Sequence, residues 1–157
     1  MTIIERESKE SNDIFFVCSF IEYLARVTKN KRGYIVNAIG HENMQKLYEY
    51  ADVYHSDNID ELTDCFIEKC NIKQGNFDNI AECKYTAPDF WDIGRVYNNL
   101  IMDIKQGETH KKNLVDILYE VYNSWIADYI DDYNSNMYYS NPGYIYQSYM
   151  EGALIKE

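Results

Sequence analysis

Glycine and proline are scarce in this 157-residue chain, which contains seven of the first and two of the second. Turn-rich β-sandwiches need more of both residues, so their scarcity disfavours that architecture. Long apolar runs are also missing, because Ser19 and Glu22 interrupt the longest stretch, residues 14–24, which is too short to span a bilayer. Residues 1–10 have no apolar run typical of a secretory signal. We therefore expect a cytoplasmic protein that does not enter the membrane.

Basic residues are few compared with acidic ones. The 15 Lys and Arg residues face 26 Asp and Glu residues, which leaves a formal net charge of −11. Such a charge repels phosphate backbones and argues against direct binding to nucleic acid. The four cysteines, Cys18, Cys65, Cys70 and Cys83, match no zinc-module spacing and are expected as free thiols. No metal or cofactor is expected, and a protein partner would be basic.

Apolar residues recur with the period of α-helices along most of the chain. The pattern predicts helices at residues 14–29, 34–39, 42–51, 59–66, 89–106, 111–133 and 142–153. Ser11, Asn12 and Asp13 are candidate caps for the first helix, and Pro88 and Pro142 stand where later helices would begin. Residues 72–87 show neither the helical nor the strand period of apolar residues. They form one candidate internal seam, a boundary between two halves of the domain. The sequence thus predicts a single all-α domain, 1–157, folded as a compact orthogonal bundle of about six or seven helices.

Familiar catalytic motifs are absent, and an enzyme has little support. The weak catalytic candidate is His55 with Asp52 and Asp57, because an imidazole between two carboxylates can act as a base or join a metal site. The structural alternative places these residues at a helix junction, where Ser56, Asp57 or Asn58 caps the next helix.

A second acidic group lies later in the chain. Asp128, Asp131 and Asp132 could hold a hard cation, since Asp128 and Asp132 share a helix face. The alternative is a solvated acidic face.

Tyrosine is unusually frequent, with 16 residues concentrated toward the end of the chain. Tyrosine offers a large contact area and a polar tip, and it concentrates at protein interfaces. We expect Tyr138, Tyr139, Tyr144 and Tyr146 to form a partner-binding surface. The same surface could equally join two copies of the chain in a homo-oligomer.

Four segments resemble known sequences. DVYHSDNIDELTDCFIEK, residues 52–69, resembles a small uncharacterised domain of low-GC Gram-positive bacteria with a D-x-L-H-T-like string, although Tyr54 and Ser56 replace the usual Leu and Thr. PDFWDIGRVYNNLI, VYNSWIADYIDDYNS and YYSNPGYIYQSY resemble the second half of a longer family of small acidic helical proteins. Relatives of the first module are often encoded beside ADP-ribosyltransferase-like or toxin-like proteins. The resemblance implies an accessory, antitoxin or immunity role.

Three functions follow as expectations. The first is a non-enzymatic protein that binds a basic protein partner, since catalytic motifs are missing and tyrosines and acidic residues abound. The second is a metal-assisted or acid–base enzyme centred on His55. The third is an acidic mimic of a nucleic acid that occupies a cationic groove of another protein.

Overall fold

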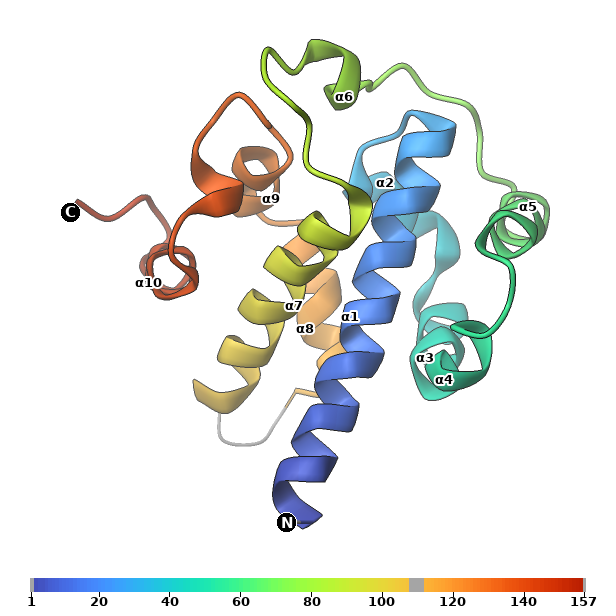
Figure 1. Ribbon diagram of the computed structural model, residues 1–157, viewed down its shortest axis with the longest axis horizontal. Helices are drawn as coiled ribbons and strands as arrows, with labels where there is room; N and C mark the ends of the chain where they lie inside the picture. Colours follow the sequence, from blue (N-terminus) through green and yellow to red (C-terminus); the bar gives the residue numbers. More distant parts are fainter. Residues whose placement is uncertain (1, 108–111, 157) are drawn as a thin grey trace.

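A 27-residue helix, α1 (Thr2–Thr28), runs through the middle of the computed structural model (Figure 1). The structure describes residues 2–107 and 112–156, with only the backbone of residues 2–8. In this part of the chain all regular structure is helical, comprising ten α-helices and one 3₁₀ turn. The predicted compact all-α bundle is confirmed. The count exceeds six or seven because α4 (Ala51–Tyr54) and α6 (Asn79–Glu82) are single turns and one predicted helix is divided.

The middle of α1 is buried around its whole circumference. Its fully buried apolar side chains are Ile14, Val17, Cys18, Phe20, Ile21, Leu24 and Ala25. The helix begins well before the predicted caps, so Ser11, Asn12 and Asp13 lie inside it and the capping prediction is wrong. Residues 5–10 include several strong helix formers, and the Lys9 ammonium pairs with the Asp13 carboxylate at 2.9 Å across one turn. Both effects extend the helix toward the N-terminus.

Helix α7 (Phe90–Gly107) packs along α1 (Figure 1). Gly94 makes the close approach, since a Cβ there would lie 2.1 Å from the Oγ and 2.9 Å from the Cα of Ser19.

Overpacking at this contact costs about 1–3 kcal/mol, more than the roughly 1 kcal/mol that alanine gains over glycine in helix propensity. Gly94→Ala should therefore lower the free energy of unfolding by about 1–2 kcal/mol in urea denaturation. Gln106→Ala, at an exposed position of α7, should change it by less than about 0.5 kcal/mol. A Gly94→Ala variant as stable as the wild type would contradict this contact.

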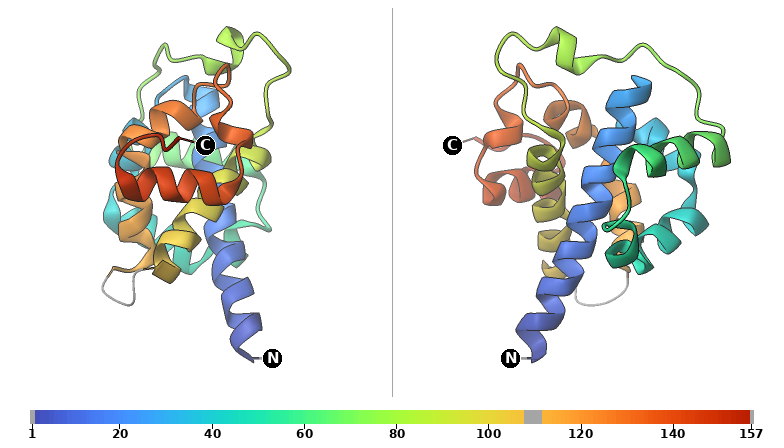
Figure 2. Two further views of the ribbon diagram at one scale, coloured as in Figure 1. Left: turned by 90° about the vertical axis from the view of Figure 1, so that its left-hand side faces the viewer. Right: turned by 45° about the vertical axis from the view of Figure 1, so that its right-hand side comes forward.

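The helices that follow α1 cover one side of it (Figure 2). They are α2 (Arg32–Ile39), α3 (His41–Glu49), α4 and α5 (Ile59–Lys69). The last part of the chain covers other faces with α8 (Leu114–Tyr122), α9 (Trp125–Ile130), the 3₁₀ turn η1 (Met137–Tyr139) and α10 (Pro142–Glu151). None of the helices in the described residues is long and apolar enough to cross a membrane.

The helix predicted at residues 111–133 is in fact two helices, α8 and α9, and residue 111 lies outside the described residues. Two polar side chains bond to the backbone at the break. The Asn123 amide donates to the carbonyl of Tyr119 at 2.9 Å, and the Ser124 hydroxyl donates to the carbonyl of Val121 at 2.7 Å. Such bonds compete with the helical ladder and favour a break. After the break, residues of α9 line the same cavity as the N-terminus of α2.

The irregular segment 72–87 crosses the top of the molecule between α5 and α7 (Figures 1 and 2). Its backbone is tied to the end of α1, because the N–H groups of Gly75 and Phe77 donate to the carbonyls of Thr28 and Lys29, both at 2.8 Å. The short helix α6 follows, with the Asp78 side chain accepting from the N–H of Ala81. This segment forms one wall of the cavity described below.

Candidate functional site

A cavity of about 800 Å³ opens between the N-terminus of α2, residues 76–82 and α9 with the turn that follows it. Its wall combines many polar residues with apolar surface. Five acidic residues line it, namely Asp78, Glu82, Asp128, Asp131 and Asp132. The basic lining residues are Lys31 and Arg32, and the asparagines are Asn37, Asn76, Asn79, Asn123 and Asn134. Aromatic surface comes from Tyr34, Phe77, Tyr122 and Tyr133.

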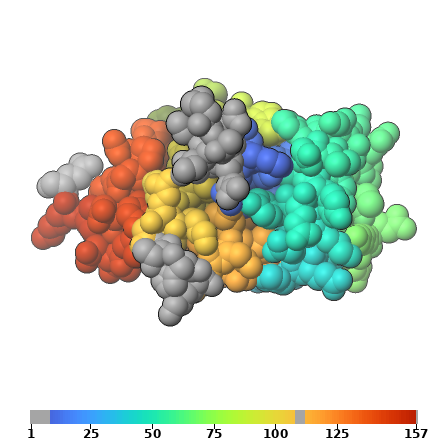
Figure 3. Space-filling view, turned by 90° about the horizontal axis from the view of Figure 1, so that it is seen from below, coloured from blue at the N-terminus to red at the C-terminus, as the bar shows by residue number. Residues whose placement is uncertain are grey.

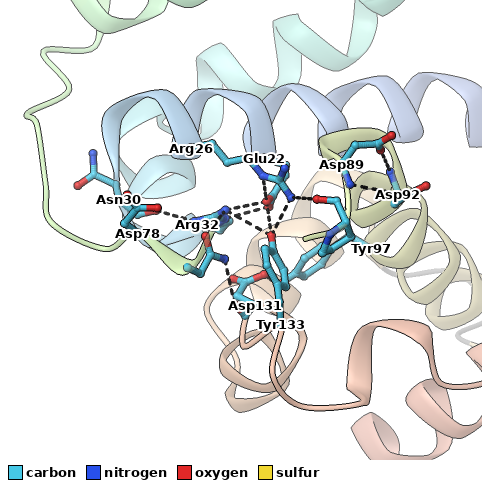
Figure 4. A network of polar contacts seen from close by, with 12 residues as sticks. Glu22, Arg26, Asn30, Arg32, Asp78, Asp89, Asp92, Tyr97, Asp131 and Tyr133 are labelled. Atoms are coloured by element: carbon cyan, nitrogen blue, oxygen red, sulfur yellow. Dashed lines mark hydrogen bonds and ion pairs between the residues drawn. The ribbon is translucent and has the colours of Figure 1, made fainter. Parts of the chain in front are cut away.

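Arg32, which lines this cavity, belongs to a buried ion pair (Figure 4). The Arg32 guanidinium on α2 binds the Glu22 carboxylate on α1 in bidentate fashion, with Nε to Oε1 at 2.8 Å and Nη2 to Oε2 at 2.6 Å. Both side chains are at most 1% exposed. Arg26 donates from Nε to Glu22 Oε2 at 2.6 Å, and the Tyr133 hydroxyl also donates to Glu22. The network fixes α1, α2 and the turn after α9 relative to one another.

The charge on Glu22 is held by its partners. Burial by itself raises the pKa of the Glu22 carboxyl, but the charges of Arg32 and Arg26 and the hydrogen bonds to the carboxylate outweigh it and lower the pKa to about 2. Glu22 therefore stays ionised at neutral pH and neutralises Arg32.

Asp131 has a different environment, although it belongs to the same network (Figure 4). It is 6% exposed, and its Oδ1 accepts a hydrogen bond from the Tyr97 hydroxyl at 2.8 Å. Among the described residues no Lys, Arg or His forms an ion pair with it. Burial raises the pKa of Asp131 to about 7, although the charge of Arg32 acts in the opposite direction. A buried carboxyl group without a counter-ion thus lines the cavity.

The other charges of the cavity leave it acidic. Five acidic and two basic lining residues give a formal charge of 2 − 5 = −3. Glu22 already neutralises Arg32, which makes the unbalanced charge more negative. Asp78 pairs with Lys29 at 3.6 Å, whereas Glu82, Asp128 and Asp132 have no basic partner within the part of the chain described. No group of three potential metal ligands exists among the described residues. The excess of carboxylates favours a cationic ligand over an anionic one.

His55, Asp52 and Asp57 lie outside this cavity. The His55 ring packs 5.3 Å from the ring of Phe16 and 6.1 Å from that of Trp91. The Asp52 side chain accepts from the N–H of Val53, and none of the hydrogen bonds in the described residues joins His55 to either aspartate. His55 ends α4, and the Asn58 side chain caps α5 by accepting from two backbone N–H groups, at 2.8 and 3.2 Å. These contacts match the helix-junction alternative.

None of the four tyrosines near the C-terminal end lines this cavity, although the ring of Tyr138 lies 5.7 Å from that of Tyr133, which does. Figure 3 shows that end and the α3–α4 region on opposite sides of the molecule. Tyr139 is 64% exposed, whereas Tyr138, Tyr144 and Tyr146 are half-buried against the core. The Tyr144 hydroxyl donates to the carbonyl of Ile155 at 3.2 Å. The structure therefore leaves one broadly exposed ring in this group, because the other three pack partly against the core.

None of the sequence patterns predicted Glu22, Arg32 or Tyr133 as site residues. One signal was available: Glu22 interrupts a helix whose other faces are apolar, and a charge in such a position must be paired. Asp131 was grouped with Asp128 and Asp132, and all three do line one cavity. Asp131 differs by being buried, while the other two are exposed.

Comparison with known proteins gives no match: no protein-family model, no curated protein and no solved structure matches this chain. The resemblance described from the sequence therefore stays a prediction.

Proposed function

We propose that this protein is a non-enzymatic binding protein that holds a basic protein partner at the acidic cavity, in an accessory, antitoxin or immunity role. The observation that carries the proposal is the charge of the cavity, with five acidic lining residues against two basic ones, one of which is already neutralised. Carboxylates on the rim attract a positively charged surface and speed its association. The net charge of −11 acts in the same direction.

The make-up of the wall favours binding over chemistry. Its polar groups are mainly carboxylates and side-chain amides, which recognise N–H donors. The cavity volume of about 800 Å³ is large enough for side chains of a partner and is open at the surface. Polar, solvent-accessible surface is common at the rim of protein interfaces.

Neutralising two rim carboxylates tests the proposal. Glu82 and Asp128 are exposed, and their side chains form no hydrogen bond or ion pair within the described residues. The Glu82→Gln/Asp128→Asn variant should retain about fivefold less partner than the wild type in affinity purification from the native host at moderate salt, because each rim charge contributes a modest attraction. Quantitative mass spectrometry measures the retained amount.

The matched control changes the same number and kind of charges elsewhere. Asp64→Asn/Glu68→Gln alters two exposed carboxylates on α5, on the other side of the molecule (Figure 1). This control should retain the partner as the wild type does. Equal loss in both variants would mean that only net charge matters, and no loss in the cavity variant would place the partner elsewhere.

A further inference from the structure

We infer that the cavity receives one arginine side chain of the partner, and that Asp131 is the carboxylate that pairs with its guanidinium group. The inference rests on the proposed function, which supplies a basic protein as the source of that arginine. It adds the chemical group that is recognised and the residue that recognises it.

Asp131 lacks a counter-ion because the nearest buried cation is committed to other acceptors. Arg32 donates to both oxygens of Glu22, to the carbonyl of Asn30 at 3.0 Å and to Oδ1 of Asn79 at 3.2 Å. The Asn79 side chain in turn donates to the backbone carbonyl of Asp131 at 2.9 Å. This bond fixes the backbone that carries the carboxylate. Leaving a buried charge unpaired is costly, and an incoming cation removes that cost.

The wall favours a guanidinium group over an ammonium group. Asp128 and Asp132 line the same cavity as Asp131, together with several side-chain amides, and these acceptors match the five N–H donors of a planar guanidinium. A guanidinium is also less strongly hydrated than an ammonium, which lowers the cost of burial. The ring of Phe77 already has cations near it, with Arg32 at 5.7 Å and Lys31 at 5.9 Å from its centroid.

An anion is the competing ligand, because Lys31, Arg32 and the N-terminus of α2 lie on one wall of the cavity. The Arg32 charge is used by Glu22, however, and Asp131 with the rim carboxylates would repel a phosphate. We therefore expect inorganic phosphate to leave the cavity residues unperturbed.

A peptide series tests the inference on the full-length protein. The probes are acetyl-Gly-Arg-Gly-amide, its Lys and citrulline analogues, and inorganic phosphate, followed by NMR titration at pH 8 and low salt. The Arg peptide should bind at the cavity, with the Lys peptide weaker and the neutral citrulline peptide weaker by about tenfold or more. Asp131→Asn should weaken binding of the Arg peptide by about tenfold, whereas Asp64→Asn on α5 should leave it unchanged.

Three results would overturn the inference: equal binding of the Arg and citrulline peptides, undiminished binding to a folded Asp131→Asn variant, or phosphate perturbing the same signals. Its failure is distinguishable from failure of the proposed function. If partner retention still depends on Glu82 and Asp128 while binding of the Arg peptide does not depend on Asp131, the binding function stands and the arginine site is wrong. If the Arg peptide needs Asp131 but no protein depends on the rim, the guanidinium site stands and the protein partner is wrong.

Discussion

Replacing Glu22 with Gln should lower the free energy of unfolding by about 3–5 kcal/mol, the cost typical of breaking a buried ion pair on one side. Glu22 is 1% exposed and accepts hydrogen bonds from Arg32, Arg26 and Tyr133. A neutral amide keeps one acceptor oxygen but leaves the Arg32 guanidinium buried without a counter-ion. Urea denaturation at pH 7, followed by circular dichroism, measures the loss.

Two further variants make the result specific to the ion pair. Glu68→Gln, at an exposed position on α5, should change the free energy of unfolding by less than about 0.5 kcal/mol. Glu22→Gln combined with Arg32→Gln should lose less than the sum of the two single variants, because the pair is coupled. A loss below about 1 kcal/mol for Glu22→Gln would contradict a network that holds α1, α2 and the turn after α9 together.

Replacing Asp131 with Asn should raise the stability of the free protein at pH 8, by about 1–3 kcal/mol. The wild type must ionise a carboxyl that is buried and lacks a counter-ion, and the neutral amide avoids that cost. The amide oxygen can still accept the hydrogen bond from Tyr97. Thermal and urea unfolding at pH 8 measure the gain, and a clear loss of stability would contradict this view of the site.

The gain should depend on pH with a defined sign. Because the pKa of Asp131 is raised in the folded state, the carboxyl supports folding at low pH, and this support is lost as the pH rises through about 7. The advantage of Asp131→Asn should therefore be small near pH 4, grow toward pH 7 and then level off. The groups that act on Asp131 are Glu22 from α1, Arg32 from α2, Tyr97 from α7 and Asp128 from α9.

These two variants separate structural from functional charge. Glu22 is paired by Arg32 and Arg26, so it stabilises the fold. Asp131 lines the cavity without such a partner, so we expect it to lower the stability of the free protein. Residues that weaken a fold in this way are typical of binding sites, where the ligand supplies the missing contact. Under the proposed function the missing contact comes from the partner.

The sequence was sufficient to predict most of the helices. Apolar spacing predicted α2, α3, α5 and α7 within a few residues, and Pro142 does stand at the first position of α10. Helix ends were less predictable, because they depend on contacts that spacing does not encode. The break between α8 and α9 is one example, since it depends on bonds from Asn123 and Ser124 to their own backbone.

The candidate site could not be predicted in the same way. Glu22 and Arg32 are ten positions apart, but Tyr133 lies 111 positions beyond Glu22, and only the packing of α9 near α2 brings these groups together. The apolar periodicity of a single helix does not predict contacts between residues so far apart in the sequence. Tyrosines posed a related problem, because abundance does not distinguish a ring that fills the core, such as Tyr97, from one that is exposed, such as Tyr139.

The most direct test of the account is a pH titration of the Asp131 carboxyl carbon by NMR, with and without acetyl-Gly-Arg-Gly-amide. We expect a midpoint near 7 in the free protein, because the carboxyl is buried without a counter-ion. The Arg peptide should lower that midpoint, since a bound cation favours the ionised form. A midpoint near the ordinary aspartate value, unchanged by the peptide, would contradict the claim that Asp131 binds a cation in this cavity.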